Sequence, residues 1–424
     1  MNKTALLFPG QGSQFVGMGK SLCENFSSAR QVFEEASYVL GFDIKKLCHE
    51  GDIEELTRTE NTQPAILTSS VAAFKVYMEE IGIKPLYCAG HSLGEFSALT
   101  CSGAIEFQDA VKIVNKRGKF MQDAVPIGAG AMAAVTGIDQ SVIEEECRKV
   151  STSENLVVVS NYNSPEQIVI SGHKNAVGQI EEILNKKGAR VIPLKVSAPF
   201  HSPLMQPAAE RLKQELQEYT YKDMDYPVIS NVTALPYRGK EDIVENLSLQ
   251  ITKAVRWQDS MRYLQQNGIE IVIDIGPQSV LKNLMKKNAS DIKAYSFDRP
   301  EDEKQFKDSL LTESKQFIDT KQSKTRLIER CIAIVVCTQN KNWNNDEYQQ
   351  GVVEPYNKVR KMMDTLKKED REPTISEMSY ALDMLRTVFI TKKTPIEEQI
   401  DRFEQIFNET GLRKMFLNFK MPAL

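Results

Sequence analysis

The feature that most restricts how this chain can fold is a serine between two glycines, in the segment Cys88-Ala-Gly-His-Ser-Leu-Gly-Glu95. The pattern Gly90-x-Ser92-x-Gly94 follows a short apolar run and precedes a stretch with helical character. Glycines at these two positions let a strand turn sharply into a helix and leave the serine hydroxyl exposed. The spacing therefore predicts a nucleophile at the end of a strand. An ordinary strand–helix turn is the alternative interpretation.

Short apolar runs alternate with helical patterns through the first 300 residues. The runs 3–8, 85–89 and 268–275 each end at a turn that contains glycine. Strands that alternate with helices usually pair in parallel and are covered by helices. We therefore expect an α/β domain with a parallel sheet and helices on both of its faces.

Residues 128–195 have a pattern of their own. Strands are predicted at 131–137, 156–160, 167–171 and 190–194, helices at 140–149 and 173–187, and a turn at 161–166. The order β-α-β-β-α-β is that of a ferredoxin-like unit. Because the chain then returns to the main pattern, we expect an inserted subdomain at 128–195 within a discontinuous catalytic domain formed by 1–127 and 196–300.

Beyond residue 300 the pattern becomes helical. Of 22 glycines, only Gly351 and Gly411 lie in this part of the chain. Capping boxes are predicted at Thr374 and Thr394, each with a glutamate three residues later, and Gly411 is predicted to end the last long helix. We therefore expect a C-terminal helical extension over 301–424.

Composition excludes several classes of function. The net charge of −4 provides no overall positive field for nucleic acid or an anionic membrane. No apolar run approaches the roughly 20 residues of a membrane span, and the N-terminus lacks the apolar core of a secretory signal. The seven cysteines form no CxxC pair, which favours reduced thiols in the cytoplasm. The four histidines are too widely spaced for a metal site.

A serine hydroxyl needs a base to become a nucleophile. His91 adjoins Ser92, but neighbouring side chains on a tight elbow diverge. His201 lies in a Pro-Phe-His sequence, and a loop that contains proline is stiff enough to hold an imidazole in a fixed position. We expect His201 to be the base, with an ordinary surface histidine as the alternative.

Several motifs stand in a characteristic order along the chain. They are Phe8-Pro-Gly-Gln-Gly-Ser-Gln14, Gly90-His-Ser-Leu-Gly-Glu95, Arg117-Gly118 with Met121-Gln122, Asn161-Tyr-Asn-Ser-Pro165, Pro199-Phe-His-Ser202, Val255-Arg-Trp257 and Gly276-Pro277. In order and spacing they resemble the malonyl-CoA:acyl carrier protein transacylases of fatty-acid and polyketide synthesis. The resemblance covers residues 1–295 and implies an α/β-hydrolase-like large domain with an inserted ferredoxin-like subdomain.

The resemblance also implies a catalytic constellation. Ser92 would attack the malonyl thioester, and His201 would take the serine proton and later protonate the departing thiolate. The main-chain amides of Gln11 and Leu93 would form the oxyanion hole. Gln250 would accept a hydrogen bond from the histidine, so that a neutral carbonyl fixes the tautomer without a buried carboxylate.

The resemblance also implies how the acyl group is selected. Burying the free carboxylate of malonyl without a partner costs several kcal/mol. The resemblance gives its recognition to Arg117, whose guanidinium can make two parallel charge-assisted hydrogen bonds. A surface ion pair is the alternative role. Phe200 would fill the space that an extra methyl group needs, and His91 would line the substrate site as a packing or gating residue.

The implied reaction is ping-pong acyl transfer between malonyl-CoA and an acyl carrier protein, with no metal or redox cofactor. Carrier proteins of this kind are acidic, and candidate docking residues are Lys253, Arg256, Lys282, Lys286 and Lys287, with a solvated face as the alternative. The extension favours an enzyme that serves a polyketide or hybrid lipopeptide synthase. The alternatives are a fatty-acid transacylase, an editing hydrolase of the same fold, a non-catalytic scaffold and a lipase.

Overall fold

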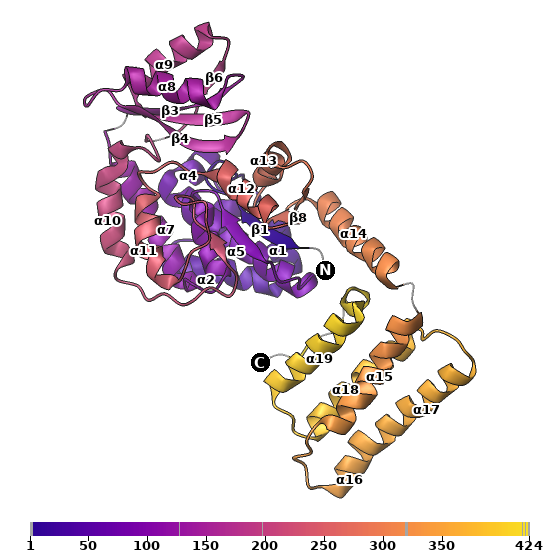
Figure 1. The fold of residues 1–424 in the computed structure, drawn as a ribbon. Coiled ribbons are helices and arrows are strands. Elements are labelled where there is room, and N and C mark those ends of the chain that lie inside the picture. Colours follow the sequence, from indigo (N-terminus) through magenta and orange to yellow (C-terminus); the bar gives the residue numbers. More distant parts are fainter. Residues whose placement is uncertain are drawn as a thin grey trace. The chain divides into compact units, whose positions relative to one another are not determined.

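The structure, a computed structural model, describes residues 3–126, 128–196, 198–318, 321–417, 419 and 421–422. The chain divides into two compact units (Figure 1). The first lies within residues 2–303 and the second within residues 304–424. We call them the catalytic body and the C-terminal bundle, and each is described by itself.

A parallel five-stranded sheet lies at the centre of the catalytic body, in the order β7-β2-β1-β8-β9. The strands are β1 (Thr4–Phe8), β2 (Tyr87–Gly90), β7 (Val228–Ile229), β8 (Ile271–Asp274) and β9 (Lys293–Ser296). All five residues of β1 are buried, as expected of a strand that is covered on both faces. The predicted parallel sheet is therefore confirmed.

Helices cover both faces of this sheet. Ala5 and Leu7 of β1 belong to one apolar cluster with Trp257 and Met285, whereas the ring of Phe8 lies 6.4 Å from that of Phe74. Alternate residues of the strand therefore pack against different helices. The helices of this part are α1 (Lys20–Asn25), α2 (Ser27–Leu40), α3 (Ile44–Glu50), α4 (Ile53–Thr57), α5 (Thr59–Glu80), α6 (Leu93–Cys101), α7 (Phe107–Asp123), α10 (Gln206–Leu216), α11 (Ile243–Leu249), α12 (Trp257–Gln266) and α13 (Val280–Asn288). Helix α14 (Pro300–Ile318) begins in the catalytic body and continues into the residues of the second unit.

The inserted segment forms an antiparallel sheet in the order β4-β5-β3-β6, with α8 and α9 on one face (Figure 1). Its elements are β3 (Gly130–Thr136), α8 (Gln140–Val150), β4 (Val157–Ser164), β5 (Gln167–His173), α9 (Lys174–Lys186) and β6 (Arg190–Pro193). The predicted β-α-β-β-α-β order is confirmed, and with it the ferredoxin-like subdomain.

The turn predicted at 161–166 is wrong in its first four residues. Strand β4 continues to Ser164 through two register shifts in its pairing with β5. On its other edge, the N–H of Tyr162 donates to the carbonyl of Val255, and the N–H of Val255 donates to the carbonyl of Ser160. These main-chain bonds from a distant segment hold the strand extended, and local turn propensity contains no information about them. They also attach the subdomain to the large domain.

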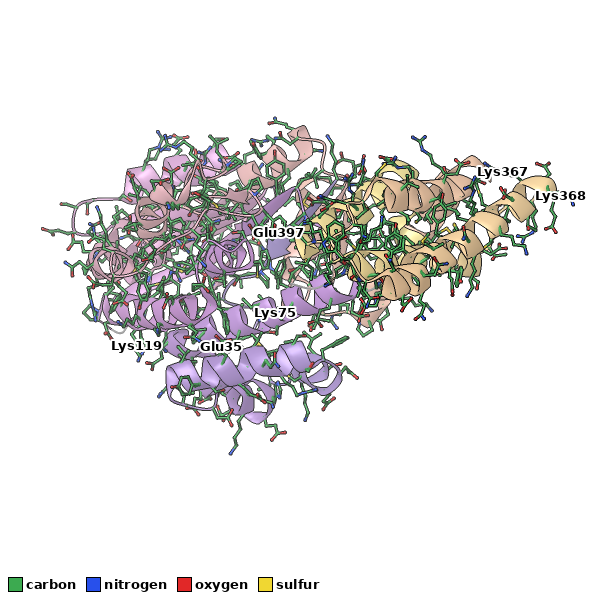
Figure 2. The ribbon with its side chains drawn as sticks, turned by 90° about the horizontal axis from the view of Figure 1, so that it is seen from below. Glu35, Lys75, Lys119, Lys367, Lys368 and Glu397 are labelled. Atoms are coloured by element: carbon green, nitrogen blue, oxygen red, sulfur yellow. The ribbon has the colours of Figure 1, made fainter. Side chains whose placement is uncertain are left out.

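The C-terminal bundle is helical around one apolar cluster, which includes Leu327, Met378, Phe389, Phe403 and Phe407. Its elements are α15 (Lys321–Cys337), α16 (Asn345–Tyr348), the π-helical turn η3 (Gln349–Val353), α17 (Glu354–Lys368), α18 (Ile375–Thr391), α19 (Ile396–Thr410) and the 3₁₀ turn η4 (Leu412–Phe416). Figure 2 shows Lys367 and Lys368 at the end of α17, where positive charge complements the helix dipole.

The two predicted capping boxes have different outcomes. Thr374 caps α18 and Glu377 returns the hydrogen bond, so this box is confirmed. The second box is wrong, because Pro395 is the residue that precedes α19 and the hydroxyl of Thr394 has no hydrogen-bond partner among the described residues. Proline has no N–H, and its fixed geometry starts the helix without a side-chain cap. Gly411 ends α19 in a left-handed conformation, as predicted.

Candidate active site

The serine elbow lies at the carboxyl end of strand β2, which pairs with the central strand β1. Ser92 has φ 51° and ψ −106°, a conformation that is strained for a residue with a side chain. A Cβ atom on Gly94 would collide with the carbonyl of Phe8, and one on Gly90 would collide with the main chain of Gly94. The two glycines therefore let the elbow lie against β1, and the first turn of α6 starts beside the serine hydroxyl.

Ser92 and His201 meet in the fold although 109 residues separate them. The Oγ of Ser92 lies 2.8 Å from Nε2 of His201. His201 is 4% exposed and also has a positive φ, of 57°. Burial and the nearby charge of Arg117 lower the pKa of His201 to about 3, so the imidazole is neutral at pH 7. A neutral Nε2 can accept the serine proton.

Gln250 contacts the histidine through its main chain. Nδ1 of His201 donates to the carbonyl oxygen of Gln250 at 2.7 Å, which leaves Nε2 free of hydrogen and facing Ser92. The side-chain amide of Gln250 makes other contacts. Its Nε2 donates to the carbonyl of Ser92, and its Oε1 accepts from Arg117 at 2.9 Å. The expected neutral carbonyl is therefore present, and it belongs to the backbone.

Arg117 projects from the middle of α7 into the interior. It is 1% exposed, and its Nη2 lies 3.3 Å from Oγ of Ser92. Its Nη1 donates to Oε1 of Gln63 at 2.8 Å, while its Nε has no hydrogen-bond partner in the part of the chain that the structure describes. Burial lowers the pKa of Arg117 to about 9, and the charge of Glu95 opposes that shift. The side chain is thus a buried cation, and no carboxylate among the described residues contacts it directly.

A cavity of about 530 Å³ opens onto the pair Ser92 and His201 between the large domain and the subdomain. Gln11, Leu93, Phe200 and His91 all line it, together with Arg117. The ring of His91 lies 5.5 Å from that of Trp257, and its Nε2 lies 2.8 Å from Oδ1 of Asn163. The cavity is therefore lined by every site residue expected from the sequence except Gln250. That residue lies outside the lining and contacts His201 and Arg117.

Four further residues complete the site, and the sequence reasoning did not identify them. Asn231 accepts from the N–H of Ser92 at 2.7 Å and donates to the carbonyl of Gly90, so it braces the elbow. Gln63 holds the guanidinium of Arg117. Glu95 and Asn163 lie within motifs that were recognised but received no role. No local pattern marks Gln63 or Asn231.

Three of the five candidate docking residues are neutralised. Arg256 pairs with Asp259, Lys282 with Asp302, and Lys287 with Glu166. Within the described ranges, Lys253 and Lys286 form no ion pair. Lys287 also lines the cavity.

The described residues contain neither a metal-binding cluster of side chains nor a helix able to span a membrane. No cluster of three or more histidine, cysteine, aspartate or glutamate side chains suitable for a metal ion occurs among the described residues. No helix in the described part of the chain is both long and apolar enough to cross a membrane.

Comparison with known sequences extends the likeness beyond the site. The model of the acyl transferase domain family matches residues 5–305. A malonyl CoA-acyl carrier protein transacylase of Bacillus subtilis is 49% identical over 302 residues, which are 71% of this chain and 95% of the relative. Another from Bacillus subtilis is 41% identical over 403 residues, which are 94% of this chain and 99% of the relative. The second match therefore extends into the C-terminal bundle.

Solved structures of malonyl transacylases are also similar to this chain. A malonyl CoA-acyl carrier protein transacylase from Clostridium perfringens matches with a TM-score of 0.71 and 39% identity, over 75% of this chain and all of the other. The complex of a type II polyketide synthase acyl carrier protein with its malonyl-transacylase matches with a TM-score of 0.68 and 41% identity, over 69% of this chain and 95% of the other. The chain thus belongs to the acyl transferase family and, within it, to the malonyl CoA-acyl carrier protein transacylases.

Proposed function

We propose that this protein transfers a malonyl group from malonyl-CoA to the phosphopantetheine thiol of an acyl carrier protein, through an ester on Ser92. The observation that carries this proposal is the position of one hydroxyl between a base and an anion-binding group. Oγ of Ser92 lies 2.8 Å from Nε2 of His201 and 3.3 Å from Nη2 of Arg117. This arrangement suits a substrate with a reactive carbonyl near a carboxylate.

The first half-reaction is acylation of Ser92. Nε2 of His201 takes the hydroxyl proton while Oγ attacks the thioester carbonyl of malonyl-CoA. The main-chain amides of Gln11 and Leu93, at the edge of the cavity, donate to the developing oxyanion. The carbon–sulfur bond then breaks, and His201 gives the proton to the departing thiolate of CoA.

The second half-reaction reverses these roles. The phosphopantetheine thiol enters the cavity, His201 takes its proton, and the thiolate attacks the ester carbonyl. The bond to Ser92 breaks and Oγ regains the proton. The reaction needs no metal or redox cofactor, because proton transfer and oxyanion stabilisation supply all of the chemistry.

Selectivity for malonyl follows from the buried guanidinium of Arg117. A malonyl carboxylate gives this cation a partner in a dry site, whereas an acetyl group leaves it unpaired. Phe200, which is 7% exposed and lines the cavity, restricts the space for a branched acyl group. Discrimination against one methyl group is worth only about 1–3 kcal/mol, so some leakage is expected.

The partner is an acyl carrier protein or a carrier domain of a synthase in the cytoplasm. The basic residues that we propose meet an acidic carrier are Lys253 and Lys286, which form no ion pair within the described ranges, and Lys287, which lines the cavity and would exchange its pairing with Glu166 for one with the carrier. The C-terminal bundle is additional to the transacylase domain, since one relative is matched almost completely over the catalytic body alone whereas another is matched over the bundle as well. We propose that this additional unit adapts the enzyme to a polyketide or hybrid lipopeptide synthase.

Intact mass spectrometry after incubation with malonyl-CoA tests the proposal. A malonyl adduct is expected on the wild type and not on Ser92→Ala, and added carrier protein should remove it by transfer. Release as free malonate without transfer would instead support an editing hydrolase. The absence of any adduct would support a non-catalytic scaffold.

A further inference from the structure

Glu95 is a buried acid in the first turn of α6 that the mechanism above does not use. Its side chain is completely buried. Three donors converge on it: the hydroxyl of Tyr237 at 2.6 Å, the N–H of Asn231 at 3.2 Å and the amide Nε2 of Gln250. All three contacts use the carboxylate as an acceptor. Burial of this kind is costly unless the group is fully hydrogen-bonded, so the arrangement calls for an explanation.

The contact with Gln250 defines which way the amide of that residue points. On one side stand two acceptors, the carboxylate of Glu95 and the carbonyl of Ser92, which require the NH₂ group. On the other side stands the guanidinium of Arg117, which only donates and requires the oxygen. The amide therefore has a single orientation that satisfies all of its contacts, and Glu95 supplies the strongest acceptor for it.

The same chain of contacts brings a negative charge close to Arg117 without a direct ion pair. Glu95 is one amide away from the guanidinium, and its charge favours the protonated form of Arg117. A carboxylate in direct contact would occupy the donors that face Ser92. The intervening amide leaves that edge open for a substrate carboxylate. Burial raises the pKa of Glu95 to about 7, and its ionised form gives the buried cation a counter-charge.

We infer that Glu95 is a positioning residue for acyl selection, which acts through the side-chain amide of Gln250 to hold the guanidinium of Arg117 beside Ser92. This inference rests on the proposed malonyl transfer, since it concerns how the carboxylate of the acyl group is recognised. A merely structural role, in which Glu95 anchors Asn231 and Tyr237, is the competing explanation. That role would affect all acyl groups equally.

Glu95→Gln is the informative variant because it keeps the shape and removes the charge. One oxygen of Glu95 accepts from both the N–H of Asn231 and Nε2 of Gln250, so the oxygen of a glutamine can take that place while its NH₂ group faces the hydroxyl of Tyr237. The variant therefore keeps the contacts and removes the negative charge that strengthens the hydrogen bond to Gln250 and favours the cation at Arg117. We expect the ratio of kcat/KM for malonyl-CoA to that for acetyl-CoA to fall about tenfold, the size expected when one charge-assisted hydrogen bond becomes a neutral one. Tyr237→Phe, which removes one donor to Glu95, should lower the ratio in the same direction by a smaller factor. Tyr219→Phe is the matched control, because it removes a Tyr–Glu hydrogen bond of the same 2.6 Å length, to Glu215, away from the cavity.

A double variant separates positioning from general damage. If Glu95 acts through Arg117, adding Glu95→Gln to Arg117→Ala leaves the malonyl-to-acetyl ratio unchanged from that of Arg117→Ala alone. A fall in the double variant equal to that in the wild-type background overturns the inference, as does an equal loss of both substrates in Glu95→Gln. A wild type that forms no malonyl adduct on Ser92 overturns the proposed function instead, so the two failures are distinguishable. Thermal unfolding identifies a variant that does not fold, and Tyr237→Phe then decides the question.

Discussion

The catalytic body and the C-terminal bundle differ in what fills their interiors. In the body, Glu95, Arg117 and Gln250 are almost completely buried around the nucleophile, and both Ser92 and His201 have positive φ. In the bundle, the central cluster is apolar, and the buried Lys392 caps the end of α15 by donating to the carbonyls of Val335 and Thr338. The interior of the body contains a polar network around two residues with strained main chain. The interior of the bundle contains mainly packed hydrocarbon, and its positive-φ residues Asp370 and Lys393 lie just after the ends of α17 and α18.

The difference indicates what each unit is organised for. Buried polar groups and strained residues cost free energy, and they persist where surrounding structure enforces them. In the body they converge on one hydroxyl, so chemistry explains their presence. The bundle has the interior expected of a unit that contributes stability or a surface. Substitutions in the two units should therefore separate activity from stability.

Ser92→Ala should give the largest effect, and it should be confined to activity. We expect transfer to fall by about 10⁴-fold or more, because nucleophile and base act as a unit. The melting temperature should not fall, because the lost hydroxyl contacts the catalytic groups of His201 and Arg117, whereas the hydrogen bonds from Asn231 that brace the elbow use the main chain and are kept. Malonyl transfer and thermal unfolding on the same preparation measure both. Transfer within tenfold of the wild type would show that another residue carries the acyl group.

Phe403→Ala should give the opposite result. Phe403 is fully buried in the bundle and its ring meets that of Phe389 edge-on at 5.5 Å. Its truncation should destabilise the bundle by about 3–5 kcal/mol in chemical denaturation. Formation of the malonyl adduct on Ser92 should continue below the unfolding transition. The control is Ile390→Ala, at a side chain that is 66% exposed, where less than about 0.5 kcal/mol is expected. A comparable loss in both variants would contradict the assigned core.

Arg117→Ala tests the polar interior of the catalytic body through a different property, the selectivity of the enzyme for malonyl over acetyl groups. We expect malonyl transfer to fall about 10²-fold while acetyl transfer gains relative to it, from the loss of a charge-assisted pair worth about 1.5–3 kcal/mol. Steady-state kinetics with both CoA esters measure the ratio. Arg238→Ala, at a surface arginine that pairs with Asp242, should leave the ratio unchanged. An unchanged ratio in Arg117→Ala itself would refute the role given to this guanidinium.

Local patterns predicted the parts of the fold that depend on near neighbours in the chain. The elbow around Ser92, the central strands and the order of the inserted subdomain follow from glycine spacing and apolar periodicity. Contacts between distant segments were not predictable in this way. Strand β4 extends past Asn161 because Val255 offers main-chain partners, and Asn231 reaches the N–H of Ser92 from 139 residues away. The identity of Gln250 likewise did not show whether its main chain or its side chain would meet His201.

The smallest predicted effect concerns two threonines of the bundle that local sequence does not distinguish. Thr374 caps α18, and its hydroxyl accepts a hydrogen bond from the N–H of Glu377 at 3.2 Å. Within the described ranges, the hydroxyl of Thr394 beside α19 has no partner. Thr374→Ala should therefore cost about 1 kcal/mol of stability, the usual value for a lost N-cap. Thr394→Ala should be neutral or slightly stabilising, because it removes a buried polar group that is unsatisfied. Urea denaturation of the full chain measures both, and equal losses would mean that Pro395 does not replace the cap.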